Sequence, residues 1–194
     1  GGLLLGGLLV SAPVSSRLLQ LEKCGQSYWL DNLTRAMIRN GELERRIKEE
    51  GLRGITSNPS TFALALKSGD YDMEIQRLAL EGYGSGDIYE KLMVGDVQEA
   101  CDLLLDLHRS SDRAHGFVSL EVSPQFAHDA AGTMREARRL RELVNRPNLF
   151  IKVPGTMAGF LAIEQLPLAG RHVDGRARAL REPGDADEVV PVAV

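Results

Sequence analysis

The stretch Leu149-Phe150-Ile151-Lys152-Val153-Pro154-Gly155 combines an apolar run, a single amine within it, and a proline and glycine that end it. A short apolar run bounded in this way is typical of a buried strand. Helical periodicity follows from about Thr156 to Leu166. A strand followed directly by a helix is the repeating unit of parallel α/β proteins. The stretch therefore predicts a βα unit with a lysine near the carboxyl end of its strand.

Three further βα units are expected before this one. Their strands are predicted at Ser27–Asp31, Leu52–Thr56 and Phe117–Val122, and periodic apolar residues that favour helices follow each strand. The segment from Ser60 to His108 is expected to form at least two helices, because glycines interrupt it at 82, 84 and 86. Strands that alternate with helices imply a parallel sheet, either in a barrel or in an open doubly wound fold.

A barrel is the favoured architecture. No glycine-rich dinucleotide or phosphate-binding motif follows any predicted strand, which removes the commonest reason for an open sheet. A complete eight-unit barrel needs about 250 residues, whereas this chain has 194. The predicted fold class is therefore α/β of the (β/α)8 TIM-barrel type, with only about the first four βα units encoded.

Composition limits the function classes. Apolar residues make up 43% and charged residues 26%, and the net charge is -4, as in ordinary soluble globular proteins. Acidic and basic residues are interspersed and form no basic stripe, so no nucleic-acid partner is expected. Cys24 and Cys101 lie far apart without neighbours at metal-ligand spacing, which predicts no metal site and fits a cytoplasmic location. The apolar opening from Gly1 to Pro13 is too short to cross a membrane.

The chain divides into three predicted parts. Residues 1–17 are expected to be a disordered or artefactual lead-in, and residues 18–166 the partial barrel. Residues 167–194 are expected to be an unstructured tail, because Leu168 to Val194 contains no Lys, Phe, Trp or Tyr and has no strand or helix periodicity. Its bias to Arg, Ala, Gly, Asp and Val is typical of a GC-rich gene translated out of frame.

Each predicted strand carries a polar residue at or near its carboxyl end, namely Asp31, Asn58, Glu121 and Lys152. In a barrel these ends converge on one mouth, where the active site lies. Polar residues also begin at strand ends for structural reasons alone. Lys152 fits that explanation least, because it stands between Ile151 and Val153.

Lys152 is the predicted nucleophile. Burial lowers the pKa of an ammonium group and favours the neutral amine, which attacks a ketone and forms an imine. The protonated imine accepts the electrons of a neighbouring carbon–carbon bond as that bond breaks. Nearby carboxylates would move the protons that these steps require.

Four motifs together resemble the successive signatures of the transaldolase family, in the family's order. They are Gly25-Gln26-Ser27-Tyr28-Trp29-Leu30-Asp31, Gly54-Ile55-Thr56-Ser57-Asn58-Pro59-Ser60, Val118-Ser119-Leu120-Glu121-Val122-Ser123-Pro124 and Ile151-Lys152-Val153-Pro154-Gly155-Thr156. The resemblance covers roughly Leu18 to Gln165. It implies transfer of dihydroxyacetone from sedoheptulose 7-phosphate to glyceraldehyde 3-phosphate in the pentose phosphate pathway, without a metal or organic cofactor.

The resemblance also implies a role for each matching residue. Lys152 corresponds to the Schiff-base lysine, and Asp31 to the acid that takes the substrate hydroxyl proton during cleavage. Glu121 corresponds to the acid that works through a water in imine formation and hydrolysis. Thr56 and Asn58 correspond to a pair on the second strand, whose amide holds substrate hydroxyls near the imine.

The chain also departs from the family's pattern. The fifth strand with its catalytic Thr, and the later Ser and Arg residues that bind the sugar phosphate, have no counterpart here. The chain as given is therefore expected to be inactive and to self-associate through the open edges of a half-barrel. Two alternatives stay open: an inactive fragment with no catalytic role, and a smaller Schiff-base sugar-phosphate aldolase. The 63 positions from Asn58 to Glu121 favour the larger transaldolase.

Overall fold

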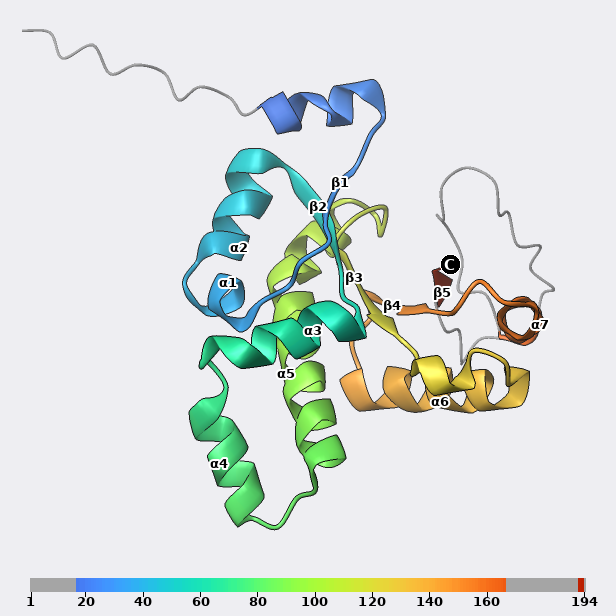
Figure 1. Cartoon of the computed structure of the whole chain (residues 1–194). Helices are drawn as coiled ribbons and strands as arrows, with labels where there is room; N and C mark the ends of the chain where they lie inside the picture. The colour runs from blue at the N-terminus through green and yellow to red at the C-terminus, as the bar shows by residue number, and fades with distance from the viewer. Residues whose placement is uncertain (1–16, 167–191, 194) are drawn as a thin grey trace, which may run out of the picture.

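The computed structural model describes residues 17–166 and 192–193 of the 194-residue chain. Residues 1–16, 167–191 and 194, which contain most of the predicted lead-in and tail, lie outside the described residues. The described part contains one sheet of five parallel strands in sequence order (Figure 1). The strands are β1 (Tyr28–Leu30), β2 (Leu52–Thr56), β3 (Phe117–Glu121), β4 (Leu149–Lys152) and β5 (Val192–Ala193).

Helices connect the first four strands, which confirms the predicted alternation of strands and helices. The α-helices are α1 (Arg35–Arg39), α2 (Glu42–Arg45), α3 (Pro59–Ala65), α4 (Asp72–Leu80), α5 (Ser85–Ser110), α6 (Ala130–Val144) and α7 (Met157–Gln165). A π-helical turn, η3 (Arg46–Glu50), continues α2, and short 3-10 turns are η1 (Arg17–Gln20), η2 (Glu22–Cys24), η4 (Leu66–Ser68) and η5 (Pro124–Phe126). The arrangement is that of part of a (β/α)8 barrel.

The two-residue strand β5 is a feature that the sequence did not predict. Val192 and Ala193 pair in parallel with Ile151 and Lys152 of β4. Two residues are too few to produce a periodic pattern, which explains why the strand was missed. The open edges expected for a half-barrel include the outer edge of its fourth strand. That expectation is wrong at Ile151 and Lys152, which pair with β5. At the other end of the sheet, β1 pairs with β2 alone among the described strands.

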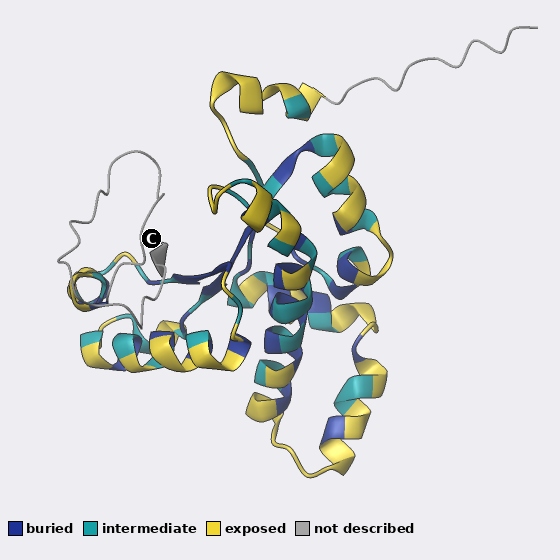
Figure 2. Cartoon of the chain, turned by 180° about the vertical axis from the view of Figure 1, so that it is seen from behind, coloured by how far each residue is buried: buried dark blue, intermediate teal, exposed yellow. Residues whose placement is uncertain are grey.

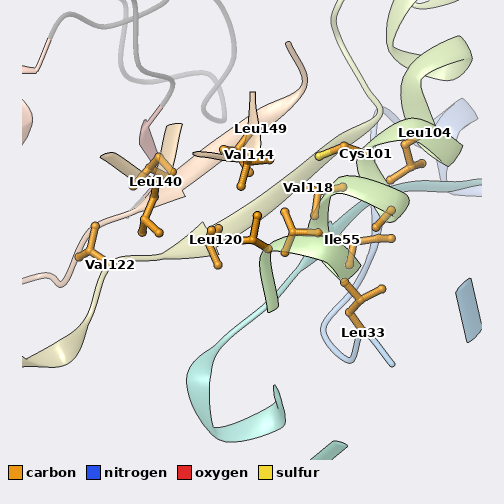
Figure 3. Packing of buried hydrophobic residues seen from close by; sticks show 14 of the residues in the cluster. Leu33, Ile55, Cys101, Leu104, Val118, Leu120, Val122, Leu140, Val144 and Leu149 are labelled. Atoms are coloured by element: carbon orange, nitrogen blue, oxygen red, sulfur yellow. The ribbon is translucent and has the colours of Figure 1, made fainter. Parts of the chain in front are cut away.

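One face of the sheet is covered by helices and forms the main apolar core. Figure 2 shows the burial of the strands and of the helix faces turned toward them. Alternate strand residues such as Ile55, Val118 and Leu120 pack against α5 and α6 (Figure 3). Partners on these helices include Cys101, Leu104, Leu140 and Val144.

The opposite face of the sheet carries a layer of aromatic rings. Phe117 and Phe150 stack with centroids 3.8 Å apart, and Trp29 lies parallel to Phe150 at 6.4 Å. The Trp29 ring crosses β2 at Gly54, where a Cβ atom would lie 2.5 Å from the indole. Only glycine allows the indole so close to the strand. This layer lies directly before the strand ends, since Trp29 is two residues from Asp31 and Phe150 is two residues from Lys152.

A buried ionic network joins three helices. Arg35 of α1 donates from Nε to Asp96 of α5 at 2.8 Å, and Tyr71, the residue before α4, donates to the same carboxylate at 2.6 Å. The Arg35 guanidinium also pairs with Glu74 at 2.6 Å and lies 4.1 Å from the Tyr71 ring centroid. Burial raises the pKa of Asp96 above its usual value, although the hydrogen bonds from Tyr71 and Arg35 act to lower it. The network fixes α1 and α4 against α5.

Among residues 17–166 and 192–193, no helix combines the length and apolar character needed to cross a membrane.

Candidate functional site

Four polar residues meet at the carboxyl edge of the sheet. Thr56, Glu121 and Lys152 are the last residues of β2, β3 and β4, and Asp31 follows β1 directly. The strand register pairs Glu121 with Lys152 and pairs Leu30 with Ile55, which sets Asp31 beside Thr56. The structure thus brings these predicted site residues together, and their catalytic roles stay predictions.

An ion pair joins the ends of β3 and β4. The Nζ atom of Lys152 lies 3.2 Å from Oε2 of Glu121, and the two side chains are 26% and 25% exposed. The apolar run predicted a buried lysine, and this prediction is wrong. Successive strand side chains point to opposite faces, so Ile151 and Val153 enter the helix-covered core while Lys152 points to the other face. The amine is half-buried and has a carboxylate partner.

A second polar contact joins the first two strands. The hydroxyl of Thr56 donates a hydrogen bond to Oδ1 of Asp31. Asp31 is exposed, and Thr56 is half-buried. The hydroxyl restricts the orientation of the carboxylate.

Asn58 begins helix α3. Its side-chain oxygen accepts from the backbone N–H of Thr61 at 2.9 Å and from the Ser60 hydroxyl at 2.7 Å. Asn at the N-cap followed by Pro59 at the first helical position is a favourable helix start. The amide oxygen of Asn58 is thus occupied by its own helix, and its NH2 group is the part that remains for a ligand.

Sequence reasoning missed Ser119. This residue of β3 is 1% exposed, and its Oγ has no hydrogen-bond partner among the described residues. Strand alternation puts its side chain on the same face as Glu121, two residues further along β3. The only signal in the sequence was a small polar residue between Val118 and Leu120.

Among the described residues, the histidines and cysteines form no second site. His108 is buried, with Nδ1 2.8 Å from the carbonyl oxygen of His115 and its ring against Phe117. Burial lowers the pKa of His108. Cys24 and Cys101 are free thiols, exposed and buried respectively. Within the described ranges, no three His, Cys, Asp or Glu side chains are placed to hold a metal ion.

A surface cleft of about 540 Å³ lies away from the strand ends. It is formed by α5, the residues before it and α6, with Tyr83, Lys91, Val94 and Leu143 in its wall. None of the four strand-end residues borders it. We place the candidate site at the carboxyl edge, because an amine, two carboxylates and a hydroxyl converge there.

Comparisons with known proteins identify a family and several relatives of this chain. The transaldolase/fructose-6-phosphate aldolase family model matches residues 28–174. The chain is 48% identical over 155 residues to a transaldolase of Thiobacillus denitrificans, covering 79% of this chain and 43% of that protein. It is 42% identical over 161 residues to a transaldolase 2 of Nostoc punctiforme, covering 82% of this chain and 42% of that protein. It is 44% identical over 159 residues to a transaldolase of Neisseria gonorrhoeae, covering 81% of this chain and 45% of that protein. The chain thus spans less than half the length of these curated relatives.

Proposed function

The chain belongs to the transaldolase/fructose-6-phosphate aldolase family, and we propose on this basis that it supplies the Schiff-base half of a transaldolase site. The proposed reaction transfers a dihydroxyacetone unit from sedoheptulose 7-phosphate to glyceraldehyde 3-phosphate. The observation that carries the proposal is the ion pair of Lys152 and Glu121 at the carboxyl ends of neighbouring parallel strands.

Imine formation is the first proposed step. Glu121 accepts a proton from the Lys152 ammonium, and the neutral Nζ attacks the carbonyl carbon of the ketose. The carbonyl oxygen takes a proton from Nζ and becomes the hydroxyl of a carbinolamine. This hydroxyl then takes a proton that Glu121 returns, directly or through a water, and leaves as water. A protonated imine remains on Lys152.

Cleavage and transfer follow. Asp31 removes the proton from the substrate hydroxyl on the far side of the bond to be broken. The electrons of the carbon–carbon bond pass to the imine, which becomes an enamine, and the shorter aldose leaves. The enamine carbon then attacks the aldehyde of the acceptor, and the steps reverse. The Thr56 hydroxyl orients Asp31, and the NH2 group of Asn58 is proposed to hold substrate hydroxyls.

A polypeptide that consists of residues 1–194 alone is proposed to lack sustained turnover. It covers less than half the length of its curated relatives, and the resemblance assigns the phosphate-binding residues to the remaining length. Binding energy from a remote phosphate positions the reacting carbons, so its loss lowers the rate by orders of magnitude. The same polypeptide is proposed to self-associate, because the outer edge of β1 is unpaired in the described sheet. A cytoplasmic location is proposed from the two free thiols.

An aldolase that cleaves without transfer is the second candidate, since the matching family model includes fructose-6-phosphate aldolases. The three helices α3, α4 and α5 between β2 and β3 favour the larger transaldolase, as do the names of the relatives.

The test is a chimaeric barrel in which residues 28–166 replace the matching part of the Thiobacillus denitrificans relative. Products are measured with and without an aldose acceptor, and Lys152→Ala in the same chimaera is the control. Transfer that needs both the acceptor and Lys152 supports the transaldolase proposal. Cleavage at the same rate without acceptor would replace it with the aldolase, and a folded chimaera without either reaction would refute both.

A further inference from the structure

The cleft of about 540 Å³ follows one side of the long helix α5. Its wall contains Asp87, Lys91, Val94 and Gln98, which recur at intervals of three or four residues and therefore lie on one helix face. Tyr83, just before the helix, continues this row. The first half of α5 projects beyond the sheet beside α4 (Figure 1). A second molecule can therefore approach this face without meeting the sheet.

Gly95 lies in the wall of the same cleft, and no packing among the described residues requires glycine there. It stands in the interior of a 26-residue helix, where glycine is less favourable than alanine. A Cβ atom at this position would meet nothing within 4 Å. Glycine is the residue that lets another group approach a backbone closely. The open space over Gly95 therefore fits a side chain from another molecule.

The cleft face also carries two opposite charges that do not pair with each other. Asp87 and Lys91 are one helical turn apart, a spacing that favours an ion pair. Lys91 instead lies over the Tyr83 ring, with Nζ 4.4 Å from the ring centroid, and neither charged group forms a salt bridge with a described residue. Both side chains are exposed. Glu90 differs, because it pairs with Arg139 of α6.

We propose that a second copy of this chain occupies the cleft, with the two α5 helices antiparallel about a two-fold axis. An axis at position 89 sets Asp87 opposite the partner's Lys91. The same axis sets Tyr83 opposite the partner's Gly95, because both pairs of residues are centred on position 89. A two-fold interface uses the same patch on both copies, and this patch is complementary to itself in charge and in shape. The candidate site and the sheet edge take no part, so the inference is independent of the proposed function.

Exposed leucines at the two ends of the cleft fit the same pairing. Leu80, three residues before Tyr83, is 90% exposed, and Leu143 of α6 is 42% exposed. Leu143 marks the other end, since its carbonyl oxygen accepts from Gln98 at 3.2 Å. Antiparallel pairing brings the Tyr83 end of one copy to the Gln98 end of the other, so Leu80 approaches the partner's Leu143. Removing both side chains from water favours association.

The test uses charge-reversed variants of the full 194-residue chain, with dimers measured by sedimentation and native mass spectrometry. Asp87→Lys and Lys91→Asp each set like charges opposite one another, so each alone should raise the dimer Kd by about tenfold or more. A mixture of the two variants should form heterodimers, because every pair is then attractive. The double variant should dimerise like the unsubstituted chain. Asp106→Lys, at an exposed position of α5 outside the cleft, is the control and should leave the Kd unchanged.

Gly95→Ala tests the packing separately from the charges. At a concentration too low for dimers, the alanine should leave the melting temperature unchanged or raise it, since its methyl group enters open space. The dimer Kd should nevertheless rise by about tenfold, because the methyl group displaces the Tyr83 ring of the other copy.

Four results would each overturn the proposal. They are a monomeric unsubstituted chain, single charge variants that dimerise as tightly as that chain, a mixture of these variants without heterodimers, and an unchanged Kd in Gly95→Ala. Association through the outer edge of β1 gives a different result, because it would be equally strong in all of these variants.

Discussion

The Nζ atom of Lys152 lies 3.2 Å from Oε2 of Glu121, and the two residues are direct register partners at the ends of β4 and β3. A nucleophilic amine needs a group that takes its proton, and this pair provides one without any rearrangement. Its position at the carboxyl edge of a parallel sheet is where barrel enzymes bind their substrates.

Replacing Glu121 with Gln keeps the side-chain volume but removes the proton acceptor. We expect imine trapping with dihydroxyacetone to slow by roughly 10²-fold. The free energy of unfolding should change by less than about 1 kcal/mol, because the ion pair is partly exposed. Glu136→Gln, which breaks an ion pair with Arg139 on α6, is the matched control and should trap at the normal rate. Equal rates of imine trapping in the two variants would show that Glu121 takes no part in imine formation.

Asp31→Asn separates the two proposed steps. In the chimaeric barrel, imine trapping should continue near the unsubstituted rate, because Lys152 and Glu121 are intact. Transfer to an acceptor should fall by about 10²-fold or more, since the asparagine cannot take the substrate hydroxyl proton. The measurement is the ratio of trapped enzyme to transfer product. If the variant loses trapping and transfer equally, Asp31 acts in imine formation, before the carbon–carbon bond is cleaved.

Arg35→Met should destabilise the fold by about 3–5 kcal/mol, because it leaves the buried Asp96 carboxylate without its cation. Arg35 and Asp96 are 4% and 3% exposed in the pair. Arg39→Met is the control, since Arg39 and Glu99 are 52% and 41% exposed and should contribute within about 1 kcal/mol. Denaturant unfolding measures both. Similar losses in the two variants would mean that the network is not a significant source of stability.

His108 should make the fold less stable in mild acid. Burial lowers the pKa of His108 below its usual 6.5, so the unfolded chain binds a proton at a higher pH than the native protein does. Above the pKa that His108 has in the unfolded chain, the fold has the full stability that the neutral imidazole contributes. This contribution is lost as the pH falls through the lower pKa that His108 has in the folded protein. His108→Phe keeps the contact with Phe117 and should show a shallower loss of stability between about pH 7 and 5. His128→Gln, at an exposed position, should retain the steep loss, and a steep loss in His108→Phe would contradict the assignment.

The strands, and the positions of the polar residues at their carboxyl ends, were largely predictable from the sequence. Apolar runs marked β2 with its observed bounds, and the polar residues at the strand ends marked Asp31, Glu121 and Lys152. These features are local in sequence, and the parallel topology brings the strand ends together at one edge of the sheet. The burial of Lys152 was not predictable from the run Ile151 to Val153, because burial depends on which face of the strand a residue occupies.

Other features depend on contacts that a sequence pattern does not contain. The ring of Trp29 over Gly54 joins two strands, and the network of Arg35, Tyr71 and Asp96 joins three helices. Ser119 stands out only once its register partners are known. These residues are ordinary in type, and their importance comes from long-range packing.

The most direct test of the proposed chemistry is to trap the imine in the chain itself. The protein is incubated with dihydroxyacetone and cyanoborohydride, digested, and mapped by mass spectrometry. We predict one dominant adduct, on the peptide that contains Lys152, and its loss in Lys152→Ala. Lys91, which is exposed and stacks over Tyr83 at 4.4 Å, serves as an internal measure of non-specific labelling. Labelling of Lys152 no faster than Lys91, or an adduct that survives Lys152→Ala at another position, would contradict the assignment of Lys152 as the Schiff-base residue.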